Sequence, residues 1–202
     1  VEDLLKMNPE MATLLGDHRF DAQLTDRSAA AIATQAKLSR DYLAKLAAID
    51  PKTLSQTNAI DHEILKSNLD RAIFEAEELK EHEWNPIYYN MGSAIYSLIA
   101  RDFAPLDQRL ASVKGRLEAI PTVIAAAKAN LKNPPEIHTK TAMQQNQGNI
   151  GLIKDELTQF VSQSPKMEKE LAPARAAAVA ALEEYGQWLE KDLLPRSTGD
   201  FR

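Results

Sequence analysis

Two His-Glu dipeptides, which begin at His62 and His82, come nearest to a metal site in this sequence. A helical zinc-peptidase site needs a second histidine four residues after the first. Both imidazoles then share one helical face, and the glutamate between them acts as a base. That position holds Lys66 in one case and Pro86 in the other. Neither dipeptide can form this site, and we expect a structural or solvent-facing role for both.

Other catalytic patterns are also missing from the sequence. The Glu-x-x-His motif of di-iron bundles needs a glutamate three residues before a histidine, and none of the four histidines has one. The chain has no cysteine, which excludes disulfides and thiolate ligands. It contains neither Gly-x-Ser-x-Gly nor the phosphate-binding Gly-x-x-x-x-Gly-Lys. We predict no catalytic residue, no metal site and no cofactor in this chain.

Two segments are left as candidates for contacting a substrate. Four ionisable side chains crowd the loop at residues 17–21, and aromatic side chains gather at residues 84–96. Tyrosine and tryptophan rings could line a groove for a peptide or a sugar. Clusters of these kinds more commonly cap helices, cross-link loops or fill gaps between helices, so both interpretations stay open. The candidate substrate-binding residues are His18, Arg19, Tyr88, Tyr89 and Asn90.

Composition and charge exclude several classes of function. The 202 residues carry a net charge of -5, with acidic and basic residues interspersed, whereas a nucleic-acid surface shows clustered lysine and arginine. The longest uncharged run, residues 84–100, is too short and too polar to cross a bilayer, which takes about 20 apolar residues. We expect no nucleic-acid partner and no membrane span. No signal peptide is visible, so the sequence leaves the location unknown.

The sequence predicts an all-α fold, a multi-helix bundle of long antiparallel helices. Alanine, leucine, glutamate, lysine and glutamine dominate the composition, and these are strong helix formers. No alternating run of β-branched residues is present. Because no repeat or flexible linker interrupts the chain, we expect a single helical domain over residues 1–202.

An apolar stripe at residues 58–83 predicts the central helix of this bundle. Apolar residues recur there at helical spacing, no glycine or proline intervenes, and Pro86 follows. We expect the helix at residues 26–49 to pack antiparallel against it across a short connection. The residues expected to face one another are Leu43, Leu46, Ile49, Ile64 and Leu69.

Prolines and glycines predict where other helices begin and end. Asn8 is expected to cap a helix that begins at Pro9 and stops at Gly16. Pro105 opens another helix, and Pro121 either kinks that helix or begins a new one. Further helices are expected at residues 141–161 and 164–194.

Short sequence segments spread over the whole chain show a family resemblance. They are PEMATLLG (9–16), LTDRS (24–28), NPIYYN (85–90), ARDFAP (100–105), ANLKNPP (129–135), the segment 188–195 and GDFR (199–202). In order and spacing they resemble the N-terminal part of a bacterial family, domain of unknown function 885. Full-length members of that family resemble largely helical, deep-cleft zinc metallopeptidases, and many are exported or lipid-anchored.

The resemblance implies a non-catalytic N-terminal helical portion that forms one wall of a substrate cleft. Zinc would belong to a missing C-terminal half, which would be a partner together with a peptide substrate. This hypothesis predicts an apolar surface near Trp188 and Phe201, and either self-association or binding of the missing half. It also implies a periplasmic or lipoprotein location. The alternative is a self-sufficient helical binding or scaffold module with a polar exterior and no enzymatic role.

Overall fold

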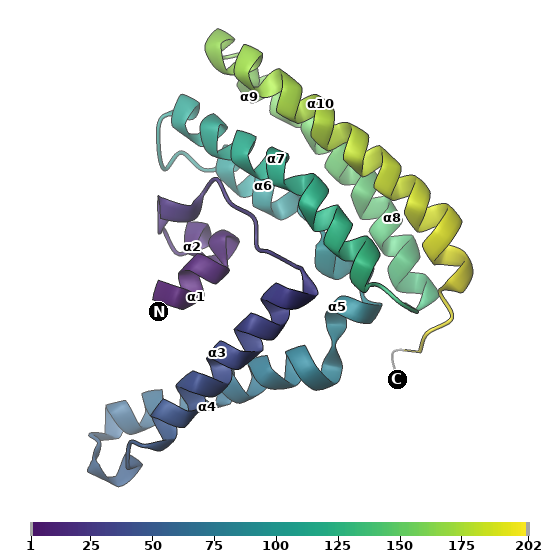
Figure 1. Ribbon diagram of the computed structural model, residues 1–202. Helices are drawn as coiled ribbons and strands as arrows, with labels where there is room; N and C mark the ends of the chain where they lie inside the picture. Colours follow the sequence, from purple (N-terminus) through teal and green to yellow (C-terminus); the bar gives the residue numbers. More distant parts are fainter. Residues whose placement is uncertain (1, 201–202) are drawn as a thin grey trace. The chain divides into compact units, whose positions relative to one another are not determined.

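The computed structural model describes residues 2–200, which form helices joined by short turns (Figure 1). Within this range the one β pairing is an isolated bridge between Pro135 and Thr198. The predicted all-α, multi-helix bundle is therefore confirmed. The α-helices are α1 (Glu2–Met7), α2 (Pro9–Leu14), α3 (Ala29–Ala47), α4 (Gln56–Phe74), α5 (Glu81–Trp84), α6 (Gly92–Ala100), α7 (Leu106–Asn130), α8 (Glu136–Gly151), α9 (Leu157–Val161) and α10 (Pro165–Trp188).

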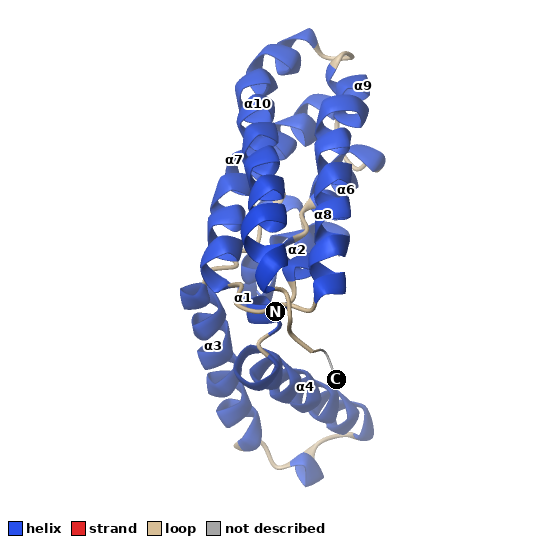
Figure 2. Ribbon diagram, turned by 90° about the vertical axis from the view of Figure 1, so that its right-hand side faces the viewer, coloured by secondary structure: helices blue, strands red, loops and turns tan. Residues whose placement is uncertain are grey.

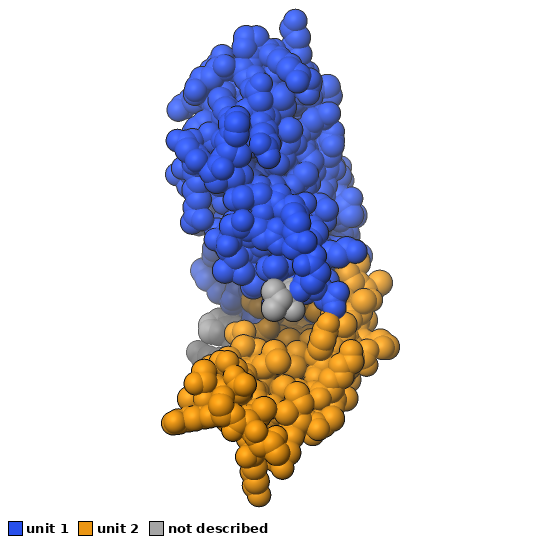
Figure 3. Space-filling model, turned by 90° about the vertical axis from the view of Figure 1, so that its left-hand side faces the viewer, with its two compact units in different colours: residues 1–27, 82–202 blue, residues 28–81 orange. Residues whose placement is uncertain are grey.

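The chain divides into two compact units, which Figure 3 colours separately. Unit 2 is Ser28–Glu81, and unit 1 is made by the described residues on either side of it. Unit 2 is therefore inserted into the sequence of unit 1. The expectation that the chain acts as one domain of a larger protein stays a prediction.

Unit 1 is a bundle whose long helices α7, α8 and α10 alternate in direction, so that α7 and α10 run the same way (Figure 1, Figure 2). α10 packs along α7 and also contacts α8, and α6 lies against α7. Their apolar faces form one core, in which Leu110, Leu117 and Leu182 are almost completely buried. The apolar stripe of α7 is the face that it turns to this core.

α7 continues through Pro121, so this proline does not begin a new helix. An interior proline destabilises a helix by about 3 kcal/mol. Ile120 and Ile124 lie on either side of it and are buried in the core. Burying each such side chain contributes roughly 1.5–3 kcal/mol. Core packing therefore outweighs the local preference for a break.

Two helices of unit 1 are lengthened by wider turns. α8 passes through the π-helical turn Leu152–Glu156 into α9, and α10 passes into a second such turn, Leu189–Leu193. A π turn has an i→i+5 spacing, so it changes the register of the apolar stripe. Ile153 and Leu152 are buried in the first turn, and Leu189 and Leu193 are buried in the second. The helices predicted near residues 141–161 and 164–194 are therefore present, each with a π turn inside it.

The start of the chain forms two short helices. α2 begins at Pro9, as predicted, and Gly16 follows it with a left-handed φ of 87°. Asn8 stands at the N-cap position, as predicted, but its side chain makes no capping hydrogen bond. Its Nδ2 instead donates backward to the carbonyl oxygen of Leu4 over 2.9 Å. Asn8 therefore ties α2 to α1 rather than closing the end of α2.

Arg116 of α7 joins this N-terminal segment to the core. Its guanidinium is completely buried and donates to the carbonyl oxygens of Ala94 and Gln23, the latter over 3.1 Å. It also donates to Thr13 Oγ1 over 2.7 Å, and Thr13 donates to Asp21 Oδ1 over 2.6 Å. Burial lowers the pKa of Arg116. These acceptors satisfy a charge that would otherwise be costly to bury.

Unit 2 is a hairpin of α3 and α4, which run antiparallel and pack side by side as predicted (Figure 1). Ser28 and Ser55 begin the two helices, because each side-chain oxygen accepts from the backbone N–H three residues later. Leu46 is buried in the hairpin, and Leu43 and Leu69 are half-buried. Part of the predicted contact is therefore confirmed.

The prediction that residues 58–83 form the central helix is wrong. α4 contains no buried residue, and the core lies in unit 1. Ile49 and Ile64, which were expected to face the partner helix, are exposed. The helix is also interrupted, since the π-helical turn Glu75–Leu79 follows α4 and Lys80 has a left-handed φ of 49°. Apolar periodicity identifies residues that share a face, but it does not identify what covers that face.

Candidate functional site

The segment of α8 at residues 144–149, here named the amide run, carries five amide side chains in six residues. α8 contacts both α6 and α10. Because successive residues of an α-helix point about 100° apart, these amides surround the helix. Asn146 points into the bundle, where it is buried and its Nδ2 donates to the carbonyl oxygen of Leu182 over 2.8 Å. The other four amides lie on the surfaces on either side of α8.

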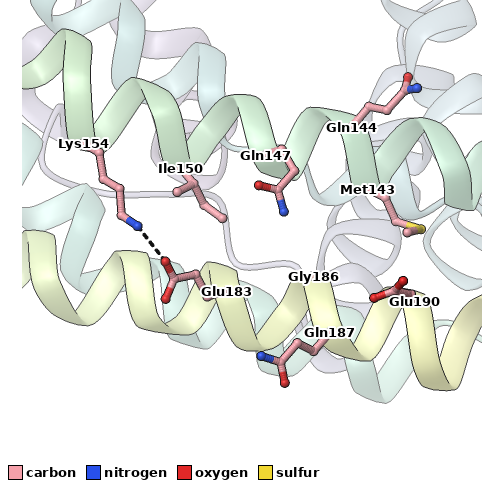
Figure 4. Close-up of a pocket in the computed structure, with 9 residues that line it drawn as sticks. All are labelled: Met143, Gln144, Gln147, Ile150, Lys154, Glu183, Gly186, Gln187 and Glu190. Atoms are coloured by element: carbon pink, nitrogen blue, oxygen red, sulfur yellow. Dashed lines mark hydrogen bonds and ion pairs between the residues drawn. The ribbon is translucent and has the colours of Figure 1, made fainter.

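A groove of about 620 Å³ runs between α8 and α10 (Figure 4). Figure 4 shows Met143 and Gln147 pointing from α8 toward α10. The Lys154–Glu183 ion pair, with an Nζ–Oε1 distance of 2.7 Å, bridges the two helices at one end. The groove therefore combines amides, aliphatic surface and one fixed ion pair. Its lining residues are Met143, Gln144, Gln147, Ile150, Lys154, Glu183, Gly186, Gln187 and Glu190.

A second groove, of about 400 Å³, lies along α6 and the other side of α8. Asn90 Nδ2 donates to Gln145 Oε1 over 2.6 Å, while Asn90 Oδ1 accepts from Gly92 N and Asn149 Nδ2. A Cβ at position 92 would lie 2.2 Å from Asn149 Oδ1, so any larger residue there would displace this amide. The exposed ring of Tyr96 lines the same groove. Amides and an aromatic ring thus converge in one open groove.

The structure separates the five residues predicted to bind substrate. Asn90 lines the groove between α6 and α8, but the linings of the two open grooves contain none of the other four. A role for any of them in substrate binding stays a prediction. The four that lie outside both linings are His18, Arg19, Tyr88 and Tyr89.

Tyr89 is a core residue that is only 2% exposed. Its hydroxyl donates to the carbonyl oxygen of His82 over 2.7 Å and accepts from Asn130 Nδ2 over 3.0 Å. Burial raises the pKa of Tyr89 to about 12. Tyr88 is half-buried, with the Arg27 guanidinium 4.1 Å from its ring centre. These rings fill space between elements, which is the second interpretation given for the aromatic stretch.

His18 and Arg19 hold the N-terminal segment of unit 1 together. Arg19 forms ion pairs with Glu2 at 2.7 Å and with Asp17 at 2.6 Å. The hydrogen bond from Arg19 lowers the pKa of Asp17 to about 2. The His18 ring stacks on Phe103 with 3.9 Å between ring centroids. This arrangement matches the interpretation in which the charged loop cross-links neighbouring segments.

The two grooves are lined by amide side chains together with a few charged ones. Among residues 2–200, no group of three or more histidine or carboxylate side chains is placed to hold a metal ion. Neutral amides donate and accept hydrogen bonds, but they do not titrate near neutral pH and so do not act as general bases.

No helix in the described part of the chain is long and apolar enough to cross a membrane.

The amide run was not predicted from the sequence. Searches for chemistry start from residues that titrate, bind metals or attack carbonyl groups, and amides do none of these. The available signal was compositional, because asparagine is a weak helix former and five amides in six helical residues are unusual. Only Asn90 was predicted among the residues that line the grooves.

Fold and site together define a helical protein with open, amide-lined grooves. Residues 9–202 match the sequence profile of a family described as "Bacterial protein of unknown function (DUF885)". The chain therefore belongs to the DUF885 family, and the resemblance found in its sequence phrases is confirmed.

A similar solved structure is described as "a putative lipoprotein of unknown function" from Shewanella oneidensis. The sequence identity is 30% and the TM-score is 0.87. The match covers 94% of this chain but 35% of that chain, so this chain spans about a third of the length of the protein it matches. No curated protein matches the chain.

Proposed function

We propose that this chain is the non-catalytic N-terminal helical portion of a longer DUF885 protein and that it forms one wall of a peptide-binding cleft. The observation that carries the proposal is the pair of open grooves on either side of the amide run. In the longer protein, the zinc implied by the resemblance to metallopeptidases belongs to the remaining portion. This chain supplies contacts to the substrate.

Amide side chains suit a peptide ligand because they donate and accept hydrogen bonds as the peptide backbone does. Gln147 and Gln187 offer such groups in one groove, and Gln145 and Asn149 offer them in the other. The exposed ring of Tyr96 adds an apolar contact for a substrate side chain. The groove volumes fall within the range of about 300–1,000 Å³ that is usual for ligand sites.

The matched protein supports a longer whole and an exported location. About two thirds of the Shewanella oneidensis chain lies outside the match. Its description as a lipoprotein supports export of the longer protein, either to the periplasm or with a lipid anchor. The missing portion and a peptide are then the partners of this chain.

A second candidate function is a self-sufficient helical binding module. It is favoured by the continuous core of unit 1, which extends from Tyr89 to Leu193 without help from another chain. The encoding reading frame distinguishes the two functions. Continuation into a helix with a His-Glu metal motif supports the first, and the lack of such a continuation supports the second.

Peptide binding by the protein that the whole reading frame encodes tests the role of the grooves. The probe is a pool of fluorescein-labelled peptides from a tryptic digest of casein, followed by fluorescence anisotropy with a chelator present to prevent cleavage. Gln147→Leu removes a groove amide without adding bulk. Because a hydrogen bond contributes about 0.5–1.5 kcal/mol, affinity should fall roughly two- to tenfold.

Gln159→Leu is the matched control, because Gln159 is an exposed amide of α9 outside both groove linings. Its affinity should equal that of the unaltered protein. Equal affinity of the two variants would show that Gln147 does not contribute to peptide binding. Failure of the unaltered protein to bind peptides saturably would overturn the assignment of peptide as the ligand.

A further inference from the structure

Unit 2 exposes an apolar face on α4. Ile60, Ile64 and Phe74 are 55%, 54% and 54% exposed. Successive residues of an α-helix are about 100° apart, so these three side chains lie within an arc of about 80°. They form a single face, named here the α4 face.

The α4 face lies on the side of the helix that α3 does not cover. His62 marks the covered side, because a ring nitrogen lies 3.2 Å from the carbonyl oxygen of Leu46 in α3. His62 is about 160° from Ile60 around the helix axis. α4 is therefore apolar on two sides, and α3 covers one of them. The half-buried residues on the covered side are Ala59, His62, Leu69, Ala72 and Ile73.

The hairpin has too little core to bury this face by itself. A helix with apolar residues on more than one side is normally covered on more than one side. In unit 2 the buried residues all belong to α3, and only Leu46 among them is a large apolar residue. An exposed apolar patch of this kind marks an interaction surface.

The surroundings of the α4 face have the pattern of an interface. Ser67 and Arg71 lie between its apolar residues on the helical surface, and Glu63 and Asp70 lie along one edge. All four are exposed. The α4 face therefore mixes apolar side chains with polar and charged ones, as non-obligate protein–protein interfaces do.

We propose that the α4 face is the docking surface for the portion of the longer protein that lies outside this chain. This inference rests on the proposed function, in which the chain is part of a longer protein. We identify the partner of the α4 face from chain length, because the similar solved chain has about two thirds of its residues outside the match. The docking element carries aliphatic or aromatic side chains opposite Ile60, Ile64 and Phe74. It carries an acidic group opposite Arg71, within the face, and a basic group opposite Glu63, at its edge.

Site-specific cross-linking in the protein encoded by the whole reading frame tests this inference. This chain has no cysteine, so Ile64→Cys introduces its one thiol, which is labelled with benzophenone-maleimide and irradiated. Mass spectrometry then identifies the attached peptide and ignores any thiol elsewhere. We expect attachment to a peptide encoded beyond residue 202. Asn58→Cys, on an exposed polar position of α4, should give at least tenfold less of this product.

Every other outcome overturns the inference. Attachment to a peptide of unit 1 shows that unit 1 covers the face, and a product of doubled mass shows that a second copy covers it. Lack of any cross-linked peptide shows an uncovered face. Ile60→Cys serves as a second probe if circular dichroism shows that Ile64→Cys does not fold.

The proposed function fails by a different observation. A reading frame that ends with this chain removes the longer protein altogether. A reading frame that continues, with no cross-link from the α4 face to the added portion, leaves the longer protein in place and rejects only this docking surface.

Discussion

Arg116 shows how one buried side chain connects distant segments of unit 1. Arg116→Leu removes the charge and leaves the hydroxyl of Thr13 and the carbonyl oxygen of Gln23 without their donor. Removal of one partner from a buried charged network costs about 3–5 kcal/mol. We expect a loss of that size in the free energy of unfolding, measured by urea denaturation.

Lys114→Ala is the control for this substitution, because Lys114 lies on α7 and makes only a long surface contact of 3.8 Å with Glu118. Its effect should stay within about 0.5 kcal/mol. A loss below about 1 kcal/mol for Arg116→Leu would show that the buried network contributes little to stability.

Ionisation of Tyr89 should lower the stability of the folded protein at alkaline pH. Its folded pKa is about 12, above the value of about 10 in an unfolded chain. The neutral hydroxyl is therefore favoured by folding, and this contribution is fully present below pH 10. It is lost as the pH rises from about 10 to 12, with a slope of up to about 1.4 kcal/mol per pH unit.

Thermal unfolding between pH 8 and pH 12 measures this loss. Tyr89→Phe cannot ionise at position 89, so its unfolding free energy should fall less steeply over the same interval. Identical slopes for the two proteins would place the alkaline sensitivity at another group.

Among the helices, two glycines differ in what a methyl group would meet. A Cβ at Gly115 of α7 would lie 2.5 Å from the carbonyl oxygen of Ala22, whereas a Cβ at Gly148 of α8 would meet nothing within 4 Å. Gly115→Ala should destabilise the protein by about 1–3 kcal/mol, because backbone must shift. Gly148→Ala should stabilise it by about 0.5–1 kcal/mol, because alanine is the better helix former.

Urea denaturation of this matched pair separates propensity from packing. The same chemical change is made in two helices of unit 1, and the expected effects have opposite signs. If Gly115→Ala were also stabilising, the segment that contains Ala22 would have to be free to move away from α7.

Helix ends were predictable because they depend on local chemistry. Proline at the first helical position and a left-handed glycine after the last turn act within a few residues. Pro9 begins α2 and Gly16 follows it, both as predicted. The interruption after α4 was not predictable in this way. Lys80 adopts a positive φ without the glycine or asparagine that normally signals it.

The role of each helix was less predictable than its limits. The apolar residues at positions 58–83 were assigned to one stripe, but those of α4 lie on two sides of the helix. A single sequence shows the apolar side chains and not the partner that buries them. The candidate site was limited in the same way, because Asn90 stood beside conspicuous tyrosines while the amides that surround it lie more than 50 residues away. The expected apolar surface near Trp188 and Phe201 stays a prediction, and Phe201 lies outside the described residues.

For the molecule as a whole, the two proposed activities belong to different units. The amide run lies in unit 1 and the α4 face lies in unit 2. Gln147→Leu should therefore weaken peptide binding without changing the cross-link from position 64. Ile64→Cys should change neither the affinity for peptides nor the effect of Gln147→Leu, because the two sites belong to separate compact units and share no residue.

The insertion of unit 2 within unit 1 also sets an order of events on the ribosome. Thr13 and its partner Arg116 are 103 residues apart. Translation adds about 5–20 residues per second, so Arg116 is synthesised roughly 5–20 s after Thr13. The hairpin of α3 and α4 joins neighbouring segments and can form during that interval. Leu14 and Leu15, exposed even in the finished structure, are then available to chaperones. The α2 segment is thus synthesised well before the residue of α7 that completes its buried hydrogen bonds.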